Sequence, residues 1–594
     1  MRVFHIFGLC ALSLTAALSF AAPSRQADEH DRLQRADTAF RAGYDAAAKG
    51  DLATARTDFE LAVKLAPDVE EGHSALGAVL YQLNAYPQAI DELSKALSIK
   101  ADDRTAQENL AMSYSQAGDF KNALGAFDKL SADAPRMDPD LLASYARAEA
   151  GNGDYSAAAT RMQEAIAASP RNALLYDQLG SIYAQQQNWP LAQASFLQAI
   201  QIDSSLAVAH LHLGVALENA PLGMTPDAGQ MQHAIEELTR AAQLGPESAS
   251  AQLELGKALA AAGRDEEAIP HFEQAQKLDA SAVEAENQLA MALQRTGAVQ
   301  NAIPLFDKVV AAQPQNTAAL SNLALALVQT GKAKDAIGYC QRVLSIQPND
   351  PGALQILGIA YLQQSDIDDS IREFQTALVI APDSPQLHYN LGLAYKLKDD
   401  LPNAVKELEE ASRLDPQSPD APYTLGILYM QGGRFDDAVK NLTMSLNRRP
   451  GNGDGWAILG SVYRQQGKNG DAVNALRKAI ELLPNQPGPH ITLASVLQEE
   501  GKKDEAAAER KKGADLTRVA VNRQRAQFAT NAANTYLEKG QIADAVTHYQ
   551  DAISSDPTFA EAHRQLAIAY EREGRNADAA NERATAEKLD SQRP

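Results

Sequence analysis

The same residue types recur at one fixed period through nearly the whole of this chain of 594 residues. The period is clearest at glycines and prolines that stand 34 positions apart: Gly358, Gly392, Gly426 and Gly460, and Pro348, Pro382, Pro416, Pro450 and Pro484. A fixed period of this size is typical of stacked repeats, in which one small helical or strand unit packs only against its neighbours. The period therefore predicts one long array in place of the several globular domains that the length alone would suggest.

Two positions of the repeat are always small. When each repeat is numbered from 1 to 34 and the first begins at Ala36, the eighth position is Gly or Ala in sixteen repeats. The twentieth position is Ala in every repeat except the one that carries Ser370. Small residues at two fixed points let two helices approach closely, and a larger side chain there would overpack the contact by about 1–3 kcal/mol.

The apolar residues between these points follow a helical spacing. Leu425, Leu428 and Tyr429 form one face of a helix. A Gly-containing turn separates two such faces in each repeat, and a Pro follows the second one, where it stops the helix. Each repeat is therefore predicted to be helix–turn–helix, and the fold class is all-α.

Residues 453–486 carry the fullest version of the pattern, and it resembles the tetratricopeptide repeat family. The resemblance covers about residues 36–593. It implies a right-handed α-solenoid of about sixteen repeats, with the first helices lining a concave groove. It also implies a protein-interaction scaffold without catalytic activity or cofactor. The matching residues are Trp456, Leu459, Gly460, Tyr463, Ala472, Leu476, Ala479 and Pro484.

The N-terminus differs from the repeats. Arg2 precedes an apolar run, and Ser19 to Ala21 supply the small residues that a signal peptidase needs. We expect a signal peptide at 1–21 and a polar linker at 22–35, which predicts export to a bacterial periplasm or the extracellular space. An uncleaved N-terminal helix that anchors the chain is the lesser alternative. Signal removal leaves Cys340 as the single cysteine, so no internal disulfide is expected.

Two departures interrupt the array. Extra residues with two Pro and two Gly predict a loop at 218–230, and five extra residues at 521–525 predict a long helix from about Lys503 towards Glu538, with Gly513 as its weak point. The predicted division is repeats 1 to the first helix of 6 at 36–217, the rest of repeat 6 to repeat 14 at 231–520, and repeats 15–16 at 526–593. The loop is either a tolerated insertion or a partner contact.

The long-helix segment is also locally basic. A solvated helix face or a contact with an anionic partner or membrane surface would both explain this. The chain as a whole has a net charge of −22, which disfavours nucleic acid as a partner. The basic residues are Lys502, Lys503, Arg510, Lys511, Lys512, Arg518, Arg523 and Arg525.

We find no phosphate-binding loop, nucleophile elbow or metal-ligand spacing, so we expect no enzyme, no metal and no cofactor. His210 and His212 would point to different sides of a helix. Five histidines share the fourth position of the repeat with Trp456, which predicts that they are packing residues. Cys340 lies at a core position. The five histidines are His73, His210, His388, His490 and His563.

The inward positions of repeats 9 to 12 are unusually apolar, which predicts a protein- or peptide-binding site, or else packing between neighbouring helices. Recurring Gln side chains beside them would hydrogen-bond an extended backbone. The predicted site residues are Leu325, Val328, Ile359, Leu362, Tyr389, Leu393, Lys396, Tyr423, Ile427 and Met430, with Gln329, Gln363 and Gln431.

A second series of amides occupies the sixth position. It is similar to the inward amide ladder of the tetratricopeptide half of O-linked GlcNAc transferases, but Ile356, Thr424 and Ile458 interrupt it. Its predicted members are Asn109, Gln178, Gln288, Asn322 and Asn390.

Two functions fit these features. The first is a non-catalytic scaffold that binds protein or peptide partners in cell-envelope assembly, a pilus or secretion system, or export machinery. The second is a regulatory or substrate-recruiting subunit of a separately encoded enzyme such as a glycosyltransferase. We expect no membrane span after signal cleavage, although a membrane-associated complex fits both functions, and the sequence predicts no oligomeric state.

Overall fold

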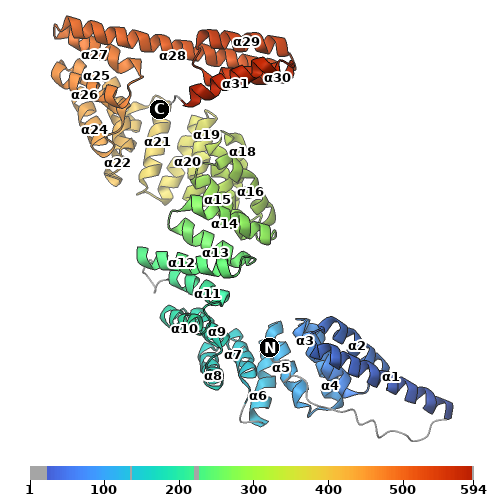
Figure 1. Ribbon diagram of the computed structural model, residues 1–594. Coiled ribbons are helices and arrows are strands. Elements are labelled where there is room, and N and C mark those ends of the chain that lie inside the picture. Colours follow the sequence, from blue (N-terminus) through green and yellow to red (C-terminus); the bar gives the residue numbers. More distant parts are fainter. Residues whose placement is uncertain (1–22, 134–136, 220–226, 592–594) are drawn as a thin grey trace. The chain divides into compact units, whose positions relative to one another are not determined.

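The computed structural model describes residues 23–133, 137–219 and 227–591. Over these ranges every regular element is an α-helix, 31 in number, and no strand occurs (Figure 1). Within the same ranges, no helix combines the length and apolar character that crossing a bilayer requires. The expected signal peptide at 1–21 lies outside the described residues.

The contacts divide the chain into two units, residues 1–313 and 314–594. Unit 1 contains α1 (Pro23–Ala48), α2 (Leu52–Leu65), α3 (Glu70–Gln82), α4 (Tyr86–Ile99), α5 (Arg104–Ala117), α6 (Phe120–Asp133), α7 (Pro139–Gly151), α8 (Tyr155–Ala168), α9 (Ala173–Gln185), α10 (Trp189–Ile202), α11 (Ala207–Glu218), α12 (Ala228–Leu244), α13 (Ala249–Ala261), α14 (Asp265–Leu278), α15 (Val283–Arg295) and α16 (Val299–Ala312).

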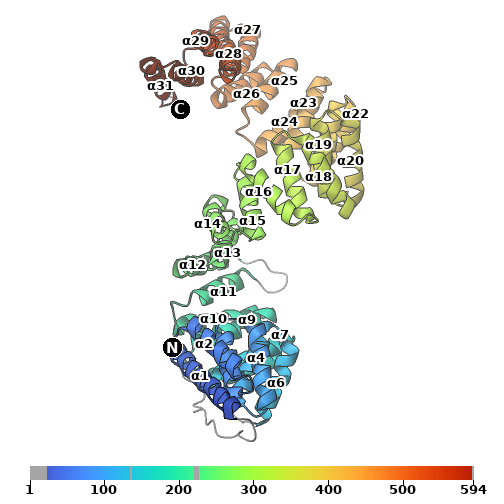
Figure 2. The ribbon, with the colours of Figure 1, turned by 90° about the vertical axis from the view of Figure 1, so that its right-hand side faces the viewer.

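Unit 2 continues the series, and within it each helix packs against the next one in the chain (Figures 1 and 2). It contains α17 (Thr317–Gln329), α18 (Ala333–Ile346), α19 (Pro351–Gln363), α20 (Ile367–Ile380), α21 (Pro385–Leu397), α22 (Leu401–Leu414), α23 (Asp420–Gln431), α24 (Phe435–Arg448), α25 (Gly453–Gln465), α26 (Asn469–Leu482), α27 (Pro487–Glu499), α28 (Lys503–Glu538), α29 (Ile542–Ser555), α30 (Ala560–Arg572) and α31 (Asn576–Ser591).

The small positions set the distance between the two helices of a repeat. A Cβ placed on Gly358 in α19 would lie 2.5 Å from Cε1 of Phe374 in α20, and Phe374 itself is fully buried. At the twentieth position, Ala404 and Ala438 are also fully buried. The sequence prediction that small residues permit close helix contact is therefore confirmed.

The turn inside every repeat except repeat 6, whose turn falls outside the described residues, contains one residue with a left-handed backbone. Gly331 and Gly467 adopt φ angles of 77° and 71° there, which glycine does without steric cost. Four repeats place another residue at this position, where the Cβ is crowded by the neighbouring carbonyl. These residues are Asn84, Gln187, Ser365 and Asp399, with φ angles of 58–66°.

The expected linker at 22–35 is wrong as a description of this segment, because α1 begins at Pro23 and continues through it. Its residues are mostly good helix formers. Their polar character fits their position, since most of the residues between 29 and 35 are exposed. The sequence prediction mistook an exposed helix for a linker.

The two interruptions have different outcomes. Of the loop expected at 218–230, residues 220–226 lie outside the described residues, and α12 already begins at Ala228. In the second interruption, α28 runs without a break over Lys503–Glu538, the range expected from the sequence, and Gly513 lies buried within it.

Candidate protein-binding surface

Four aliphatic side chains form a repeated series on the first helices of repeats 9 to 12. Leu325, Ile359, Leu393 and Ile427 lie on α17, α19, α21 and α23, at the ninth position of each repeat, and all four are half-buried. The eighth position next to each faces the second helix, and one residue further turns the side chain by about 100° away from that contact. We call these four residues the aliphatic row.

Other predicted site residues flank the aliphatic row. Leu362, Lys396 and Met430 at the twelfth position are half-buried, as are Tyr389 and Tyr423 at the fifth position. The tyrosines and Met430 also pack against the core cluster of α22 to α26, so part of their surface is structural. These residues are therefore both a rim for the row and a support for the helices beneath it.

The surroundings of Tyr423 are partly desolvated. Burial, followed by the negative charge of Asp454, raises the pKa of the Tyr423 hydroxyl above its ordinary value. The hydroxyl is therefore neutral at physiological pH, and it can both donate and accept a hydrogen bond at the edge of the row.

Val328 is not part of the surface, which corrects the sequence prediction. It is only 4% exposed, because it lies on the side of α17 that meets the neighbouring repeat. Its carbonyl accepts a hydrogen bond of 3.1 Å from the amide Nε2 of Gln363 on α19. Gln363, although exposed, therefore joins two repeats, while Gln329 and Gln431 are exposed at the ends of their helices.

The sequence analysis missed Leu397. This side chain ends α21 and is 60% exposed, beside Lys396. The signal was present, because Leu397 occupies the position at which Gln329, Gln363 and Gln431 stand in the adjacent repeats. An apolar residue in a polar series adds contact area next to the row.

The predicted amide ladder does not form a uniform series. Asn109 is 2% exposed and Gln178 is exposed, while Asn322 is half-buried. Gln288 donates to Glu284 on its own helix, at 2.9 Å. The predicted amides, whose series the sequence already interrupts, therefore lie in different surroundings, buried in some repeats and exposed in others.

Asn390 keeps an unused donor. It is 7% exposed, and its Oδ1 accepts a hydrogen bond of 3.1 Å from Gln386. Its Nδ2 is buried and has no acceptor among the described residues. A buried donor without a partner costs about 1–3 kcal/mol, so Asn390 carries a local energetic cost inside α21.

Four of the fourth-position histidines are buried and His388 is half-buried, and all five also make polar contacts that the sequence analysis did not predict. In each, Nδ1 contacts a glutamate of the second helix, and in His73 and His388 the Nε2 contacts a Pro carbonyl at 2.9 Å. The pairs, at 2.5–2.6 Å, are His73–Glu92, His210–Glu237, His388–Glu407, His490–Glu509 and His563–Glu582.

The described residues offer little that resembles a catalytic centre. No group of three or more His, Cys, Asp or Glu among them could hold a metal. Cys340 is 1% exposed, and burial raises the pKa of its thiol to about 12, so it is not a nucleophile in the folded chain. His210 contacts Glu237 and His212 contacts Asp177, so the two histidines do point apart.

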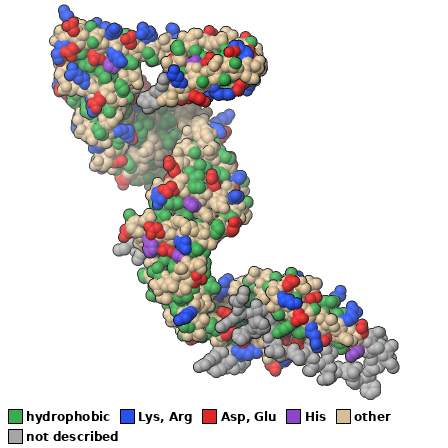
Figure 3. Space-filling model, in the orientation of Figure 1, with side chains coloured by type: hydrophobic (Ala, Val, Ile, Leu, Met, Phe, Trp, Pro, Cys, Tyr) green, Lys and Arg blue, Asp and Glu red, His purple; other side chains and the backbone are tan. Residues whose placement is uncertain are grey.

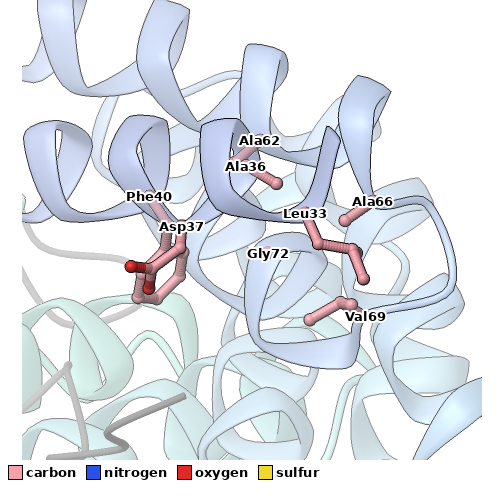
Figure 4. A pocket seen from close by; sticks show the side chains of 8 residues that line it. All are labelled: Leu33, Ala36, Asp37, Phe40, Ala62, Ala66, Val69 and Gly72. Carbon is pink, nitrogen blue, oxygen red and sulfur yellow. The ribbon is translucent and has the colours of Figure 1, made fainter. Parts of the chain in front are cut away.

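A small, partly open pocket lies between α1, α2 and α3. Figure 4 shows Asp37 and Phe40 of α1 next to each other at one side, with Ala62 and Val69 on other parts of the lining. Its volume is about 20 Å³, which holds one water molecule at most. A second, open hollow of about 390 Å³ adjoins Trp456 and Tyr463. The pocket at α1 is too small for a substrate.

Family comparisons agree with this geometry. Tetratricopeptide repeat models match residues 40–104, 108–173, 144–207 and 227–283, and another matches 533–574. The model of the cilia and flagella-associated protein 70 C-terminal domain matches residues 284–528. The chain belongs to the tetratricopeptide repeat family, and its structure is an all-α solenoid. Such repeats imply a protein–protein interaction scaffold.

Individual relatives are similar over limited stretches. Cellulose synthase operon protein C of Xanthomonas axonopodis pv. citri (strain 306) is 32% identical over 162 residues, which are 26% of this chain and 10% of that protein. The chain thus matches about a tenth of that relative's length. The Cut9–Hcn1 hetero-tetramer of the APC/C is 15% identical with a TM-score of 0.34, covering 92% of this chain and 99% of that one. YrrB, a TPR protein with an unusual peptide-binding site, is 22% identical with a TM-score of 0.30, covering 33% and 97%.

Proposed function

We propose that the chain is a scaffold that binds an apolar segment of a protein partner along the aliphatic row, Leu325, Ile359, Leu393 and Ile427. The observation that carries this proposal is the repetition of a half-buried aliphatic side chain on four successive first helices of unit 2. Half-buried aliphatic groups gain about 25 cal/mol for each Å² that a partner removes from water.

We further propose that the chain acts in the cell envelope. Two observations support this setting. Residues 1–21 have the composition of an export signal, and the 162-residue similarity is to a protein whose name associates it with cellulose synthesis. Periplasmic or extracellular location, with a partner in envelope assembly, secretion or export, is the setting that fits both.

The test compares partner capture by matched variants from envelope extracts of the source organism. Ile359→Glu with Leu393→Glu places two charges in the aliphatic row. The control, Val379→Glu with Leu61→Glu, adds the same charge at exposed apolar sites on second helices, where Val379 is 84% and Leu61 45% exposed. We expect the first variant to keep its helicity and lose the main captured protein, and the control to retain it. Equal capture by both variants would refute the row as the binding surface.

A second function is favoured by the similarity to cellulose synthase operon protein C. In that case the chain is a regulatory or recruiting subunit of a separately encoded glycosyltransferase. Adding the purified chain to envelope membranes that lack it should then change the rate of polysaccharide synthesis, and the row variant should not. If neither the native chain nor the row variant changes the rate of synthesis, the regulatory function is refuted and the scaffold function remains.

A further inference from the structure

The middle of α28 is open to solvent, because residues 517–521 are all exposed. The helix packs on α27 before this segment and on α29 and α30 after it. Val521 is 40% exposed and Phe528 is 65% exposed, which is high for large apolar side chains. This surface is separate from the aliphatic row, so its role is independent of the function proposed for that row.

Seven of the exposed residues of α28 form two series with a spacing of seven. One series is apolar and the other is basic, and all members are exposed. In an α-helix, residues seven apart lie nearly on one line, with a drift of about 20° in each heptad, and the two series alternate at steps of three and four along the same side. The apolar series is Ala507, Ala514, Val521 and Phe528, and the basic series is Lys511, Arg518 and Arg525. We call these seven residues the heptad stripe.

The charge of the stripe is largely not neutralised within the chain. Arg518 pairs with Asp515 on its own helix, at 3.0 Å. Lys511 and Arg525 have no ion-pair partner among the described residues, and the same holds for the neighbouring Arg510 and Lys512. From Leu516 to Leu537 the sequence has no Asp or Glu, although the whole chain has a net charge of −22.

Basic side chains are visible along the exposed side of α28 in the space-filling view (Figure 3). A local cationic surface on an acidic protein attracts an anionic partner and favours its encounter over that of a neutral or cationic one. The binding partner of the stripe must therefore carry negative charge where the stripe carries positive charge.

We propose that the heptad stripe docks an acidic amphipathic helix of a partner protein, with carboxylates and aliphatic residues at seven-residue spacing. From Ala507 to Phe528 the stripe extends for about 31 Å, so a partner helix that coils slightly around α28 can follow it for three heptads. Ala507 and Ala514 leave room for close approach at one end, and Val521 and Phe528 supply apolar contact at the other. An extended peptide repeats every two residues and cannot match this spacing.

An anionic membrane fits the stripe less well. Interfacial helices insert a continuous band of large apolar side chains below the headgroups. Here Phe528 is the single aromatic residue of the stripe, and a basic residue separates it from Val521. The stripe therefore has the charge for a lipid surface without the apolar area to enter it.

The test measures binding of a synthetic helical peptide to the full chain by fluorescence anisotropy. The peptide has four heptads with Glu and Leu at the two facing positions, and a second peptide replaces the facing Glu with Gln. The stripe variant is Lys511→Glu, Arg518→Glu and Arg525→Glu. The charge-matched control is Lys332→Glu, Lys334→Glu and Lys440→Glu, three exposed lysines outside α28 in the same unit.

We expect saturable binding of the Glu peptide to the native chain and to the control, and binding weakened about tenfold or more in the stripe variant. Raising the salt concentration should weaken native binding as well. Phe528→Ala should weaken binding without any change of charge, and circular dichroism should show equal helicity in all variants. The Gln peptide should bind the native chain poorly.

Three results would overturn the proposal. The first is no saturable binding of the Glu peptide to the native chain. The second is equal loss of binding in the stripe variant and the charge-matched control, which would show a general charge effect. The third is binding of the native chain to phosphatidylglycerol vesicles, lost in the stripe variant, with no binding of the peptide, which would assign the stripe to a membrane surface.

Discussion

The His–Glu contacts predict a residue exchange that can be tested directly. In repeat 11, Nδ1 of His388 lies 2.6 Å from Oε2 of Glu407, and its Nε2 lies 2.9 Å from the Pro382 carbonyl. In repeat 13, Trp456 takes the same place and donates from Nε1 to the Pro450 carbonyl at 2.9 Å. The equivalent of Glu407 in repeat 13 is Ala475. The larger Trp ring thus stands opposite the smaller Ala side chain, and the smaller His ring opposite Glu.

Each single change in repeat 11 should be destabilising. Glu407 is 9% exposed, so His388→Trp leaves a buried carboxylate without its donor and adds volume beside it. Glu407→Ala removes the acceptor and leaves a space. Loss of a hydrogen bond to a buried charged group costs about 1–3 kcal/mol, so each variant should lower the free energy of unfolding by about that amount.

The double variant, His388→Trp with Glu407→Ala, should recover most of the loss. It recreates the pair that repeat 13 already uses, so we expect its free energy of unfolding to lie within about 1 kcal/mol of that of the native chain. This corresponds to a coupling free energy of about 2 kcal/mol between the two sites. Because a repeat array can open locally, hydrogen exchange of α21 and α22 is the appropriate measurement, with α18 as the internal control. If the double variant costs as much as the sum of the two single changes, the interpretation of these pairs as interchangeable is refuted.

Two further predictions concern stability. Burial, with Asp103 close by, raises the pKa of Glu70 to about 8 from 4.5. Between these two pH values the folded chain keeps a proton that the unfolded chain releases. The free energy of unfolding therefore has its full value below pH 4.5 and falls as the pH rises towards 8. Glu70→Gln should therefore raise the urea midpoint of unit 1 at pH 8.5 relative to the native chain and change it little at pH 5, and an equal difference at both pH values would contradict this. Ser365→Gly should raise the free energy of unfolding of repeat 10 by about 0.5–1 kcal/mol, because Ser365 has a φ of 66°. The control, Gln364→Gly, changes a residue with a φ of −85° and should give no gain by thermal unfolding.

The fold was predictable because its determinants are local and repeat. The close contact of Gly358 with Phe374 joins the eighth and twenty-fourth positions of one repeat, and the same spacing recurs along the chain. The helix α28 was also predictable, since the segment lacks Pro and any turn signal. The segment at 23–35 was not, because a polar composition is common to linkers and to exposed helices such as the start of α1.

The candidate site was less predictable because it depends on the rotation between successive repeats. That rotation buries Val328 and brings Gln363 to its carbonyl, and neither contact follows from the position of a residue within one repeat. It also exposes Leu397. The His–Glu pairs had a signal that was overlooked, since each His at the fourth position of a repeat has its Glu at the same later position, shifted only in the repeat with the insertion.

The continuity of α28 has a mechanical consequence. At the other described junctions a turn outside the helices separates two consecutive helices, so a change of length in the turn can be absorbed locally. In α28 the second helix of repeat 14 is the same rod as the first helix of repeat 15. A single residue inserted near 520 would advance everything after it by about 1.5 Å and turn it by about 100°. The number of residues in α28 thus sets the rotation of repeats 15 and 16 about the axis of this helix. An insertion that a loop would tolerate would here turn a different side of the last two repeats outward.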